Sequence, residues 1–398
     1  MKYRVHQQHV KIAMVYFGIA ALLGILLRSY AIFSFDFNYR HMVHAHSHIA
    51  LLGWIYVALT TILHYCFVKR DTVDKKYSYI FWSTQATLIG MLFTFPFQGY
   101  ALFSIIFSTL FLMVSYVYVY HFWKNIDPKY KHSKGLQCVK AALIYMIISS
   151  LGPWALGAIM NTLGPQSIWY RLAIYFYLHF QYNGWMILAL VGLFLFALEQ
   201  RGTIVPNKSF QRFFWMLNVG VVLTFFLSSL WIEPSALIYL LAGLGALIQL
   251  FAFLFFWEII KNEIINLSLS ILQNLFIKTV MLLVLIKIVL QLLTSLPYFA
   301  RMATIYLEFT IGYLHMTFLG VISIGLFFLM DYFGLFRISK KLYRLYFLGF
   351  LITEILIFYK GFSAWQQWAV FDGYTEVLAL TSLLIPISLV LLLVKNRS

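Results

Sequence analysis

The residues with the clearest chemistry in this sequence are histidines, of which there are eleven. Three of them share one local pattern, a histidine followed five residues later by a glycine: His48 and Gly53, His179 and Gly184, His315 and Gly320. Inside a membrane span such a histidine can ligate a haem iron or another metal. It can also simply hydrogen-bond a neighbouring helix, with the glycine allowing close packing.

The same three histidines are evenly placed relative to basic residues. The number of residues to the next basic side chain is 21 from His48 to Lys69, 22 from His179 to Arg201 and 22 from His315 to Arg337. At 1.5 Å per residue these are roughly 32–33 Å, so we expect the three imidazoles at one depth, toward the outer face. Their separations of 131 and 136 residues predict an internal repeat of four helices.

A dense histidine cluster surrounds the first of the three, at His41, His44, His46 and His48. At about 100° per residue, His44 and His48 share one helix face and could chelate a metal, whereas His46 points to the opposite side. This segment can therefore contact two neighbouring helices at once, and it could supply one ligand to a haem and one to a second metal centre. A proton-conducting role or a packing role is equally compatible with the spacing.

The elements that must position these histidines are membrane helices. Hydrophobic residues make up 62% of the 398 residues and charged residues 11%, which excludes a soluble globular protein. Cys66 and Cys138 form no CxxC pair, which excludes a disulfide framework, a cysteine-type zinc site and covalently attached c-type haem. Metal chemistry would then rest on histidine or carboxylate.

The apolar runs predict an all-α integral membrane protein with twelve transmembrane helices. We expect a single membrane domain over 1–398, with three pseudo-symmetric four-helix arcs of approximately 1–125, 126–260 and 261–398. The predicted spans are 11–34, 42–67, 78–96, 99–122, 138–160, 169–198, 211–231, 236–258, 274–295, 303–330, 342–359 and 373–394.

The net charge of +16 indicates the orientation of the chain in the membrane. If the N-terminus is inside, 23 lysines and arginines fall on the inner side and 5 on the outer side, so both termini are predicted to be cytoplasmic. A lipid bilayer is therefore the expected partner, and a nucleic acid is not implied.

With these residues in view, the chain resembles a divergent, short member of the haem-copper oxidase subunit I superfamily. The string from His46 through Gly53 to Trp54 is similar to the paired-histidine, Gly-Trp segment of cbb-type oxidases and to the His-Ala-His segment of NnrS-type haem and copper membrane proteins. The segment from His315 to Gly320 is similar to the helix 10 ligand segment of these groups. The resemblance implies a bacterial cytoplasmic (inner) membrane protein with haem b held by histidines of helices 2 and 10.

The departures from this family concern its copper site. Such an oxidase takes one copper ligand from helix 6 and a His-His pair from helix 7, but residues 211–231 contain no histidine, and His315 is the only histidine of helix 10. His179 could stand in for the helix 6 ligand, with Tyr182 three residues on, and the helix 2 cluster could complete a copper site. Oxygen reduction coupled to proton pumping is therefore not expected.

Several other residues are interpreted as supporting groups. Arg40 and Arg171 each precede a histidine by eight residues, which suits haem propionates, although interfacial anchoring is an equal alternative. Glu308, seven residues before His315, could relay protons or orient a ligand in apolar surroundings, so Glu308 and Tyr182 are the catalytic candidates. The presence of Lys287 within a predicted span is explained by snorkelling of its side chain or by pairing. The remaining histidines are interpreted as ordinary interfacial residues: His6, His9, His64, His121 and His132.

The sequence hypothesis is thus a haem-binding membrane protein that handles electrons or a diatomic gas, without a complete oxidase copper site. Ligation by His48 and His315, with His46 or His44 as alternatives on helix 2, would give an electron-transferring haem, whereas an open position would bind NO or O2. If the protein is an enzyme, it is an oxidoreductase acting on NO or O2, served by a membrane quinol or a redox partner subunit. The alternatives are a secondary transporter and a copper or haem assembly factor for a respiratory oxidase.

Overall fold

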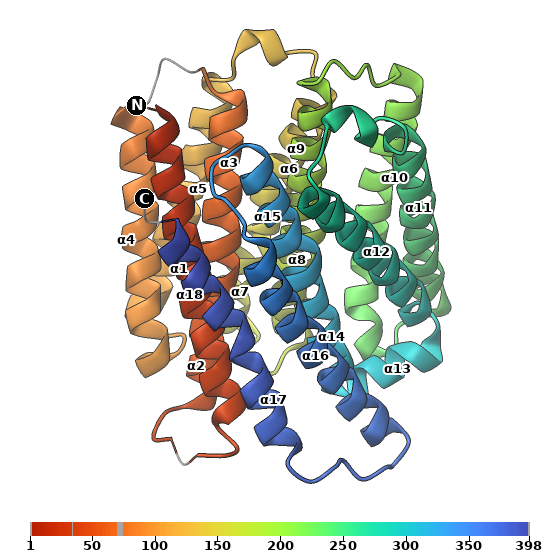
Figure 1. Cartoon of the computed structure of the whole chain (residues 1–398). Coiled ribbons are helices and arrows are strands. Elements are labelled where there is room, and N and C mark those ends of the chain that lie inside the picture. The colour runs from red at the N-terminus through yellow and green to blue at the C-terminus, as the bar shows by residue number, and fades with distance from the viewer. Residues whose placement is uncertain (1, 34, 70–74, 397–398) are drawn as a thin grey trace. The chain divides into compact units, whose positions relative to one another are not determined.

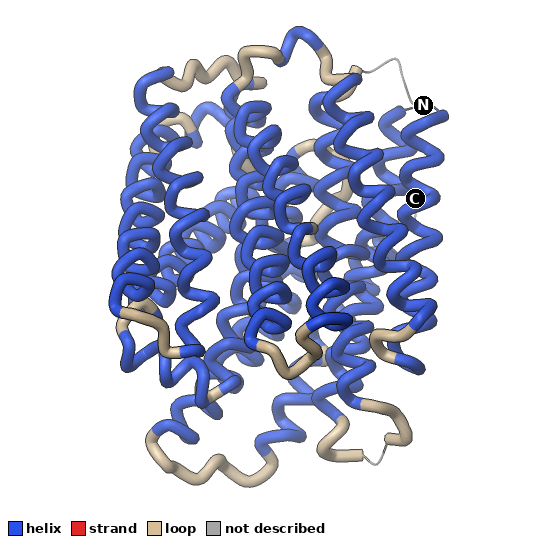
Figure 2. The backbone as a smooth tube through the Cα atoms, turned by 180° about the vertical axis from the view of Figure 1, so that it is seen from behind, coloured by secondary structure: helices blue, strands red, loops and turns tan. Residues whose placement is uncertain are grey.

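The computed structural model describes residues 2–33, 35–69 and 75–396, and within them the fold is helical, with loops only as connections (Figure 2). Twelve helical stretches are long and apolar enough to cross a membrane, which confirms the predicted number. They are Tyr3–Ser29, Tyr39–Phe67, Lys75–Gln98, Leu102–Lys124, Lys134–Thr162, Ile168–Glu199, Asn207–Ile232, Ala236–Ile260, Ile271–Thr294, Leu307–Tyr332, Lys340–Trp365 and Tyr374–Lys395.

The observed ends differ most from the predicted ends in the first and eleventh spans. The first helix begins at Tyr3, where 11 was expected, and ends at Ser29, where 34 was expected. The eleventh continues to Trp365, beyond the expected 359. Apolar runs mark only the part of a helix that lies in hydrocarbon, whereas backbone hydrogen bonding continues into polar residues that still have neighbours to pack against.

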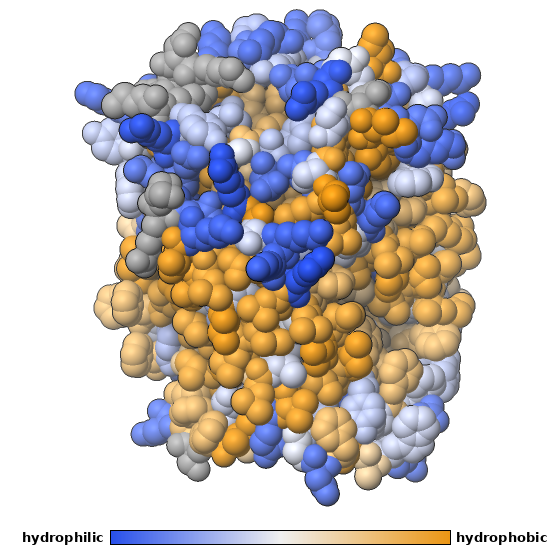
Figure 3. Space-filling view, in the orientation of Figure 1, coloured by the Kyte–Doolittle hydropathy of each residue, from blue (hydrophilic) through white to orange (hydrophobic). Residues whose placement is uncertain are grey.

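The outer surfaces of many helices are apolar, as a bilayer requires. Large hydrophobic side chains such as Phe97, Leu282 and Leu380 have exposed fractions of 82%, 58% and 64%. Hydrophobic residues are prominent on the face drawn in the space-filling view (Figure 3). Such a surface would be unfavourable in water, so the helices are suited to lipid.

The chain divides into two compact units. Unit 1 comprises residues 1–130, 326–359 and 368–398 (Figure 1). Its elements are α1 (Lys2–Ser29), α2 (Tyr39–His48), η1 (Ile49–Tyr56), α3 (Val57–Phe67), α4 (Lys75–Gln98), α5 (Leu102–Lys124), η2 (Pro128–Tyr130), most of α15 (Ser323–Tyr332) and of α16 (Lys340–Trp365), α17 (Tyr374–Ser382) and α18 (Leu384–Lys395).

Unit 2 comprises residues 131–325 and 360–367. Its elements are α6 (Lys134–Ser149), α7 (Leu151–Thr162), α8 (Ile168–His179), η3 (Phe180–Met186), α9 (Ile187–Glu199), α10 (Asn207–Leu223), η4 (Thr224–Ile232), α11 (Ala236–Ile260), η5 (Ile264–Leu267), α12 (Ile271–Thr294), α13 (Pro297–Ile305), α14 (Leu307–His315) and η6 (Met316–Ile322).

Each of the three patterned histidines is the last α-helical residue before a π-helical segment. His48 precedes η1, His179 precedes η3 and His315 precedes η6, and each span then returns to α-helix. π-helical turns inside α-helices are rare and occur frequently at functional sites. The three spans therefore share a local backbone irregularity as well as a sequence pattern.

The three spans that carry π segments are also the most buried. The buried share of their most apolar stretch is 89% for Tyr39–Phe67, 83% for Ile168–Glu199 and 67% for Leu307–Tyr332, against 28–44% for the other nine. A helix that is buried on all sides is an interior helix of its bundle. The histidines thus lie on the helices best shielded from lipid.

The patterned glycines accommodate aromatic rings from the preceding span. A Cβ atom placed on Gly53 would lie 2.9 Å from Cγ of Tyr16, and one on Gly184 would lie 2.6 Å from Cγ of Tyr145. In each unit this packing joins the π segment to a helix of the preceding membrane span. In unit 1, α1 packs against η1, and in unit 2, α6 packs against η3. In unit 2, α12 also packs against η6.

Candidate functional site

Helix α2 presents two histidines with the same tethered geometry. Nδ1 of His48 lies 2.8 Å from the carbonyl oxygen of His44, and Nδ1 of His46 lies 2.9 Å from the carbonyl oxygen of Ala20 on α1. Because a carbonyl oxygen can only accept, each Nδ1 must carry the proton. In the neutral ring, Nε2 is then the nitrogen with the lone pair, which is the form that ligates metals.

The two faces of α2 contact different helices, as the spacing predicted. The His48 ring stacks on Phe95 of α4 at a centroid distance of 4.3 Å, and the His44 ring meets Tyr100 edge-on at 4.6 Å. His46 instead lies against α1, where its Cε1 would be 3.1 Å from a Cβ on Gly24. The expectation that His44 and His48 share a face opposite His46 is confirmed.

The other ring nitrogen of His48, Nε2, has one long polar contact. The Tyr100 hydroxyl lies 3.4 Å from Nε2, near the limit for a hydrogen bond. Both residues are solvent-accessible to some degree, since His48 is half-buried and Tyr100 is 46% exposed. A Lewis acid approaching Nε2 would therefore replace only a weak interaction.

In unit 2, His179 is bound on both sides of its ring. Nε2 donates to the carbonyl oxygen of Val221 at 2.8 Å, and Nδ1 lies 3.2 Å from the side-chain amide nitrogen of Asn183, from which it accepts. This is the tautomer opposite to that of His46 and His48. In this arrangement neither nitrogen of His179 is open to a metal, and its role as a copper ligand stays a prediction.

Asn183 links His179 to a lysine that is buried in the membrane interior. The Lys287 amine donates to Oδ1 of Asn183 at 2.6 Å and to Oε1 of Gln291 at 3.1 Å. It also lies 5.9 Å and 5.7 Å from the ring centroids of Tyr182 and Tyr313. Lys287 is only 2% exposed, so of the two expected alternatives, snorkelling and pairing, the structure shows pairing. Its spacing of four residues to Gln291 was the sequence signal for an intrahelical contact.

The same network reaches the segment that contains His315. Tyr182 of η3 meets Tyr313 of α14 at 6.4 Å and Phe318 of η6 at 5.7 Å, both edge-on. His315 is half-buried two residues after Tyr313, and it belongs to unit 2, whereas His48 belongs to unit 1. Within unit 2, the π segments of the sixth and tenth spans therefore contact each other through aromatic rings.

The predicted charged groups are found near the surface. Glu308 forms an ion pair with Lys360 at 3.0 Å, and its side chain is 24% exposed, so the expected apolar surroundings are wrong. Arg171 is exposed and places its guanidinium 4.5 Å from the Trp231 ring, while Arg40 is exposed at the start of α2. The assignment of the two arginines to haem propionates stays a prediction.

Four of the five histidines interpreted as interfacial are in fact buried. His6, His9, His64 and His121 are 0%, 4%, 0% and 6% exposed, and they contact one another in unit 1. Only His132 is exposed, as expected. The sequence showed each of them near a helix end but carried no sign that the ends of α1, α3 and α5 bring them together.

The comparisons add no family to this picture. No model of a known protein family matches the chain, and no curated protein matches it. Within residues 2–33, 35–69 and 75–396, no group of three or more His, Cys, Asp or Glu side chains is placed so that it could hold a metal ion.

Proposed function

We propose that the chain is a haem b-binding integral membrane protein of the haem-copper oxidase type, which handles electrons or a diatomic gas such as NO or O2. It has twelve spans in three four-helix arcs, with both termini cytoplasmic in a bacterial inner membrane. The observation that carries this proposal is the tethering of the α2 histidines. Their Nδ1 atoms are held by backbone carbonyls, and their Nε2 atoms are the lone-pair donors.

An axial haem ligand must be a neutral imidazole of fixed orientation with an accessible nitrogen lone pair. His48 and His46 both meet this requirement, and they do so on opposite faces of α2. His44 takes part in this arrangement through its backbone oxygen, which accepts from Nδ1 of His48. Of the helix 2 candidates, His48 also has the shared spacing to a glycine and the position directly before a π segment.

Copper is left out of the proposal. The helix 6 candidate, His179, has both ring nitrogens engaged by Val221 and Asn183. Copper would need this histidine to give up the hydrogen bond at whichever nitrogen coordinates it, and would need further donors to move toward it. When bound, the haem supplies an iron that exchanges electrons or takes up a gas. The chain supplies the imidazole, its orientation and shielding from lipid.

The test is a reduced-minus-oxidised absorption spectrum of the purified full-length protein in detergent, with iron and copper analysis. We expect a b-type band and iron without stoichiometric copper. A band that shifts with carbon monoxide or NO supports gas chemistry, and an unshifted band supports electron transfer. Copper without a haem band would overturn the proposal in favour of an assembly factor, and the absence of both would favour a transporter.

A further inference from the structure

The buried histidines that the proposed haem site does not use form a cluster at one end of unit 1. We define the inner cluster as His6, His9, His64 and His121 together with Tyr77. We propose that the inner cluster is a proton-transfer site, which carries protons from the membrane surface at the N-terminal end of α1 to a polar cavity between α3, α4 and α5. This proposal does not depend on haem.

The inner cluster contains two hydrogen-bonded pairs from three helices. Nε2 of His6 on α1 lies 2.9 Å from Nδ1 of His64 on α3, and Nδ1 of His9 lies 3.2 Å from the hydroxyl of Tyr77 on α4. The pairs are in ring contact, because His64 stacks on Tyr77 at a centroid distance of 3.5 Å and an angle of 11°. His121 of α5 lies parallel to His64 at 6.0 Å.

An imidazole pair at this distance must share a proton. Two ring nitrogens can approach to 2.9 Å only if one carries hydrogen and the other a lone pair. A proton added to Nδ1 of His6 allows the Nε2 proton of His6 to move to Nδ1 of His64. The added charge then rests on the His64 ring, so this pair can hold one proton and share it between α1 and α3.

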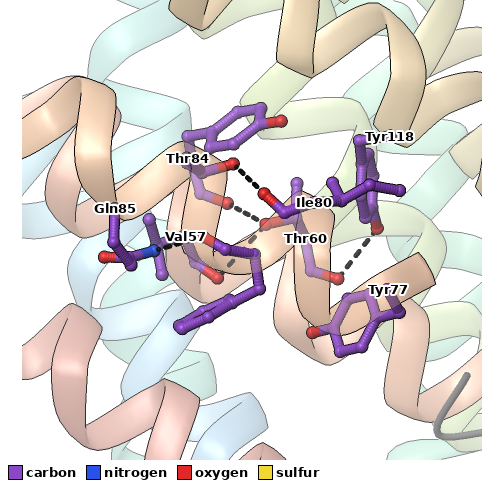
Figure 4. Close-up of a pocket in the computed structure, with 9 residues that line it drawn as sticks. Val57, Thr60, Tyr77, Ile80, Thr84, Gln85 and Tyr118 are labelled. Atoms are coloured by element: carbon purple, nitrogen blue, oxygen red, sulfur yellow. Dashed lines mark hydrogen bonds between the residues drawn. The ribbon is translucent and has the colours of Figure 1, made fainter. Parts of the chain in front are cut away.

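The second pair leads to the cavity. A proton added to Nε2 of His9 allows its Nδ1 proton to move to the oxygen of Tyr77, whose own hydroxyl proton then leaves. Tyr77 lines a small cavity with the polar residues Tyr56, Thr60, Thr84, Gln85 and Tyr118 (Figure 4). The space open to the centre of a water molecule there is about 10 Å³, which is room for about one water.

The polar residues of the cavity continue a row on the second span. Tyr56, Thr60 and His64 recur every four residues, so they follow one face of the helix. Tyr118 of α5 joins the row by donating to the carbonyl oxygen of Thr60 at 2.8 Å. Polar side chains inside a membrane are costly, and an aligned set of them that ends at a cavity is therefore expected to have a function.

Histidine and tyrosine are the groups that could carry protons here, because α1 to α5 contain no Asp or Glu. The inner cluster also faces Tyr65 of α3, whose ring is 5.6 Å from His6. Cys66 of α3, two residues after His64, is also buried. The charged groups at this end of the same helices are cations, all exposed or half-exposed: Arg4, Lys11, Lys75, Lys76 and Lys124. Their positive charge favours onward release of a proton that the inner cluster takes up.

The experiment measures exchange of side-chain protons with D2O by NMR, on full-length protein in lipid bilayers with labelled histidine and tyrosine. His179 is a matched control, since it is 2% exposed and hydrogen-bonded at both nitrogens but lies outside the inner cluster. We expect ring N–H protons of His6, His9 and His64 to exchange at least tenfold faster than that of His179. Equal rates would overturn the proposal and leave the inner cluster as helix packing. Equally fast exchange of the α3 backbone amides would also overturn it, because the helices would then be opening.

A variant tests the connection to the cavity. Tyr77→Phe keeps the aromatic ring and removes the hydroxyl, so exchange of the Tyr118 hydroxyl should slow at least tenfold while exchange at His6 is unchanged. Tyr79→Phe on the same helix is the control, because Tyr79 is 71% exposed and should have no effect. An unchanged Tyr118 rate in Tyr77→Phe would refute the route through Tyr77.

Discussion

The protonation of His48 follows from a single backbone contact, and its consequence can be tested by substitution. Nδ1 donates to the His44 carbonyl oxygen, so Nε2 is the nitrogen that would ligate the proposed haem. Loss of a group that merely orients a ligand lowers metal affinity by about 10–100-fold, and loss of the ligand itself should cost at least as much. We predict that His48→Ala loses about nine-tenths or more of the haem b absorbance per protein.

His132→Ala is the control for this variant, and His46→Ala is the comparison within helix α2. His132 is exposed, so its removal should leave the spectrum unchanged. His46 has the same tether as His48 but faces α1, and we expect its variant to retain haem. Haem loss in His46→Ala with retention in His48→Ala would exchange the two assignments. Haem retained in all three would remove helix α2 from the site.

Asn183 is predicted to be a stabilising residue of unit 2, because it serves two buried partners. Its amide nitrogen donates to His179 and its oxygen accepts from Lys287. Asn183→Leu would leave both partners without this hydrogen bond, at a cost of about 1–3 kcal/mol in the free energy of unfolding. Thermal or detergent unfolding of the purified protein measures the change.

A double variant separates this network from simple loss of packing. In Asn183→Leu combined with Lys287→Met, the buried amine is absent, so the second substitution should recover part of the stability. The expected coupling is about 0.6 kcal/mol or more, the usual size of a hydrogen bond between membrane helices. Additive effects would show that Asn183 and Lys287 act independently.

At the scale of elements, the contacts of η1 with α1 and of η3 with α6 depend on a missing side chain. A Cβ on Gly53 or Gly184 would overlap Tyr16 or Tyr145. We predict that Gly53→Ala and Gly184→Ala each destabilise the protein by about 1–3 kcal/mol, the usual cost of overpacking. Gly157→Ala in α7 is the control, because no atom lies within 4 Å of the added Cβ. It should be neutral or stabilising, since alanine favours helix.

A compensating change tests the cause of the destabilisation. If the added methyl group collides with the tyrosine ring, removal of the ring should relieve the collision. Tyr145→Ala should therefore change the free energy of unfolding more favourably in Gly184→Ala than in the parent protein. Equal effects of Tyr145→Ala in the two backgrounds would contradict the collision. The measurement is thermal or detergent unfolding of the full-length variants, and the contact that it tests is the one between α6 and η3.

The sequence predicted these elements to different extents, for physical reasons. Hydropathy records where a helix crosses lipid, and it identified all twelve spans. It contains no information on π-helical turns, because those are a matter of backbone hydrogen bonding, which hydropathy does not record. The spacing of His48 to Gly53 marked the place without revealing its backbone. Helical periodicity correctly separated His46 from His44 and His48, since that is a property of one helix.

Across the whole molecule, contacts between distant segments were the part that the sequence could not supply. His6 and His64 are 58 residues apart, and Lys287 and Asn183 are 104 apart. Considered on their own helices, His6 and His64 resembled ordinary interfacial side chains and Lys287 a snorkelling or paired one, and Asn183 carried no sign of a role. Their burial follows from which helices pack together, and composition and periodicity do not specify those pairings.

The second axial ligand is the prediction that involves the whole chain. The sequence assigns it to His315, which is the last α-helical residue before η6, as His48 is before η1. A haem with two imidazole ligands loses its six-coordinate spectrum when either is removed. We predict that His315→Ala strongly weakens haem retention, or leaves a five-coordinate haem whose band shifts with carbon monoxide. His179→Ala is the matched variant, at the same position before η3, and should keep the parent spectrum because both of its nitrogens are bound within unit 2. Undiminished haem and an unshifted band in His315→Ala would remove the tenth span from the site and leave His46 and His48 as the remaining candidates.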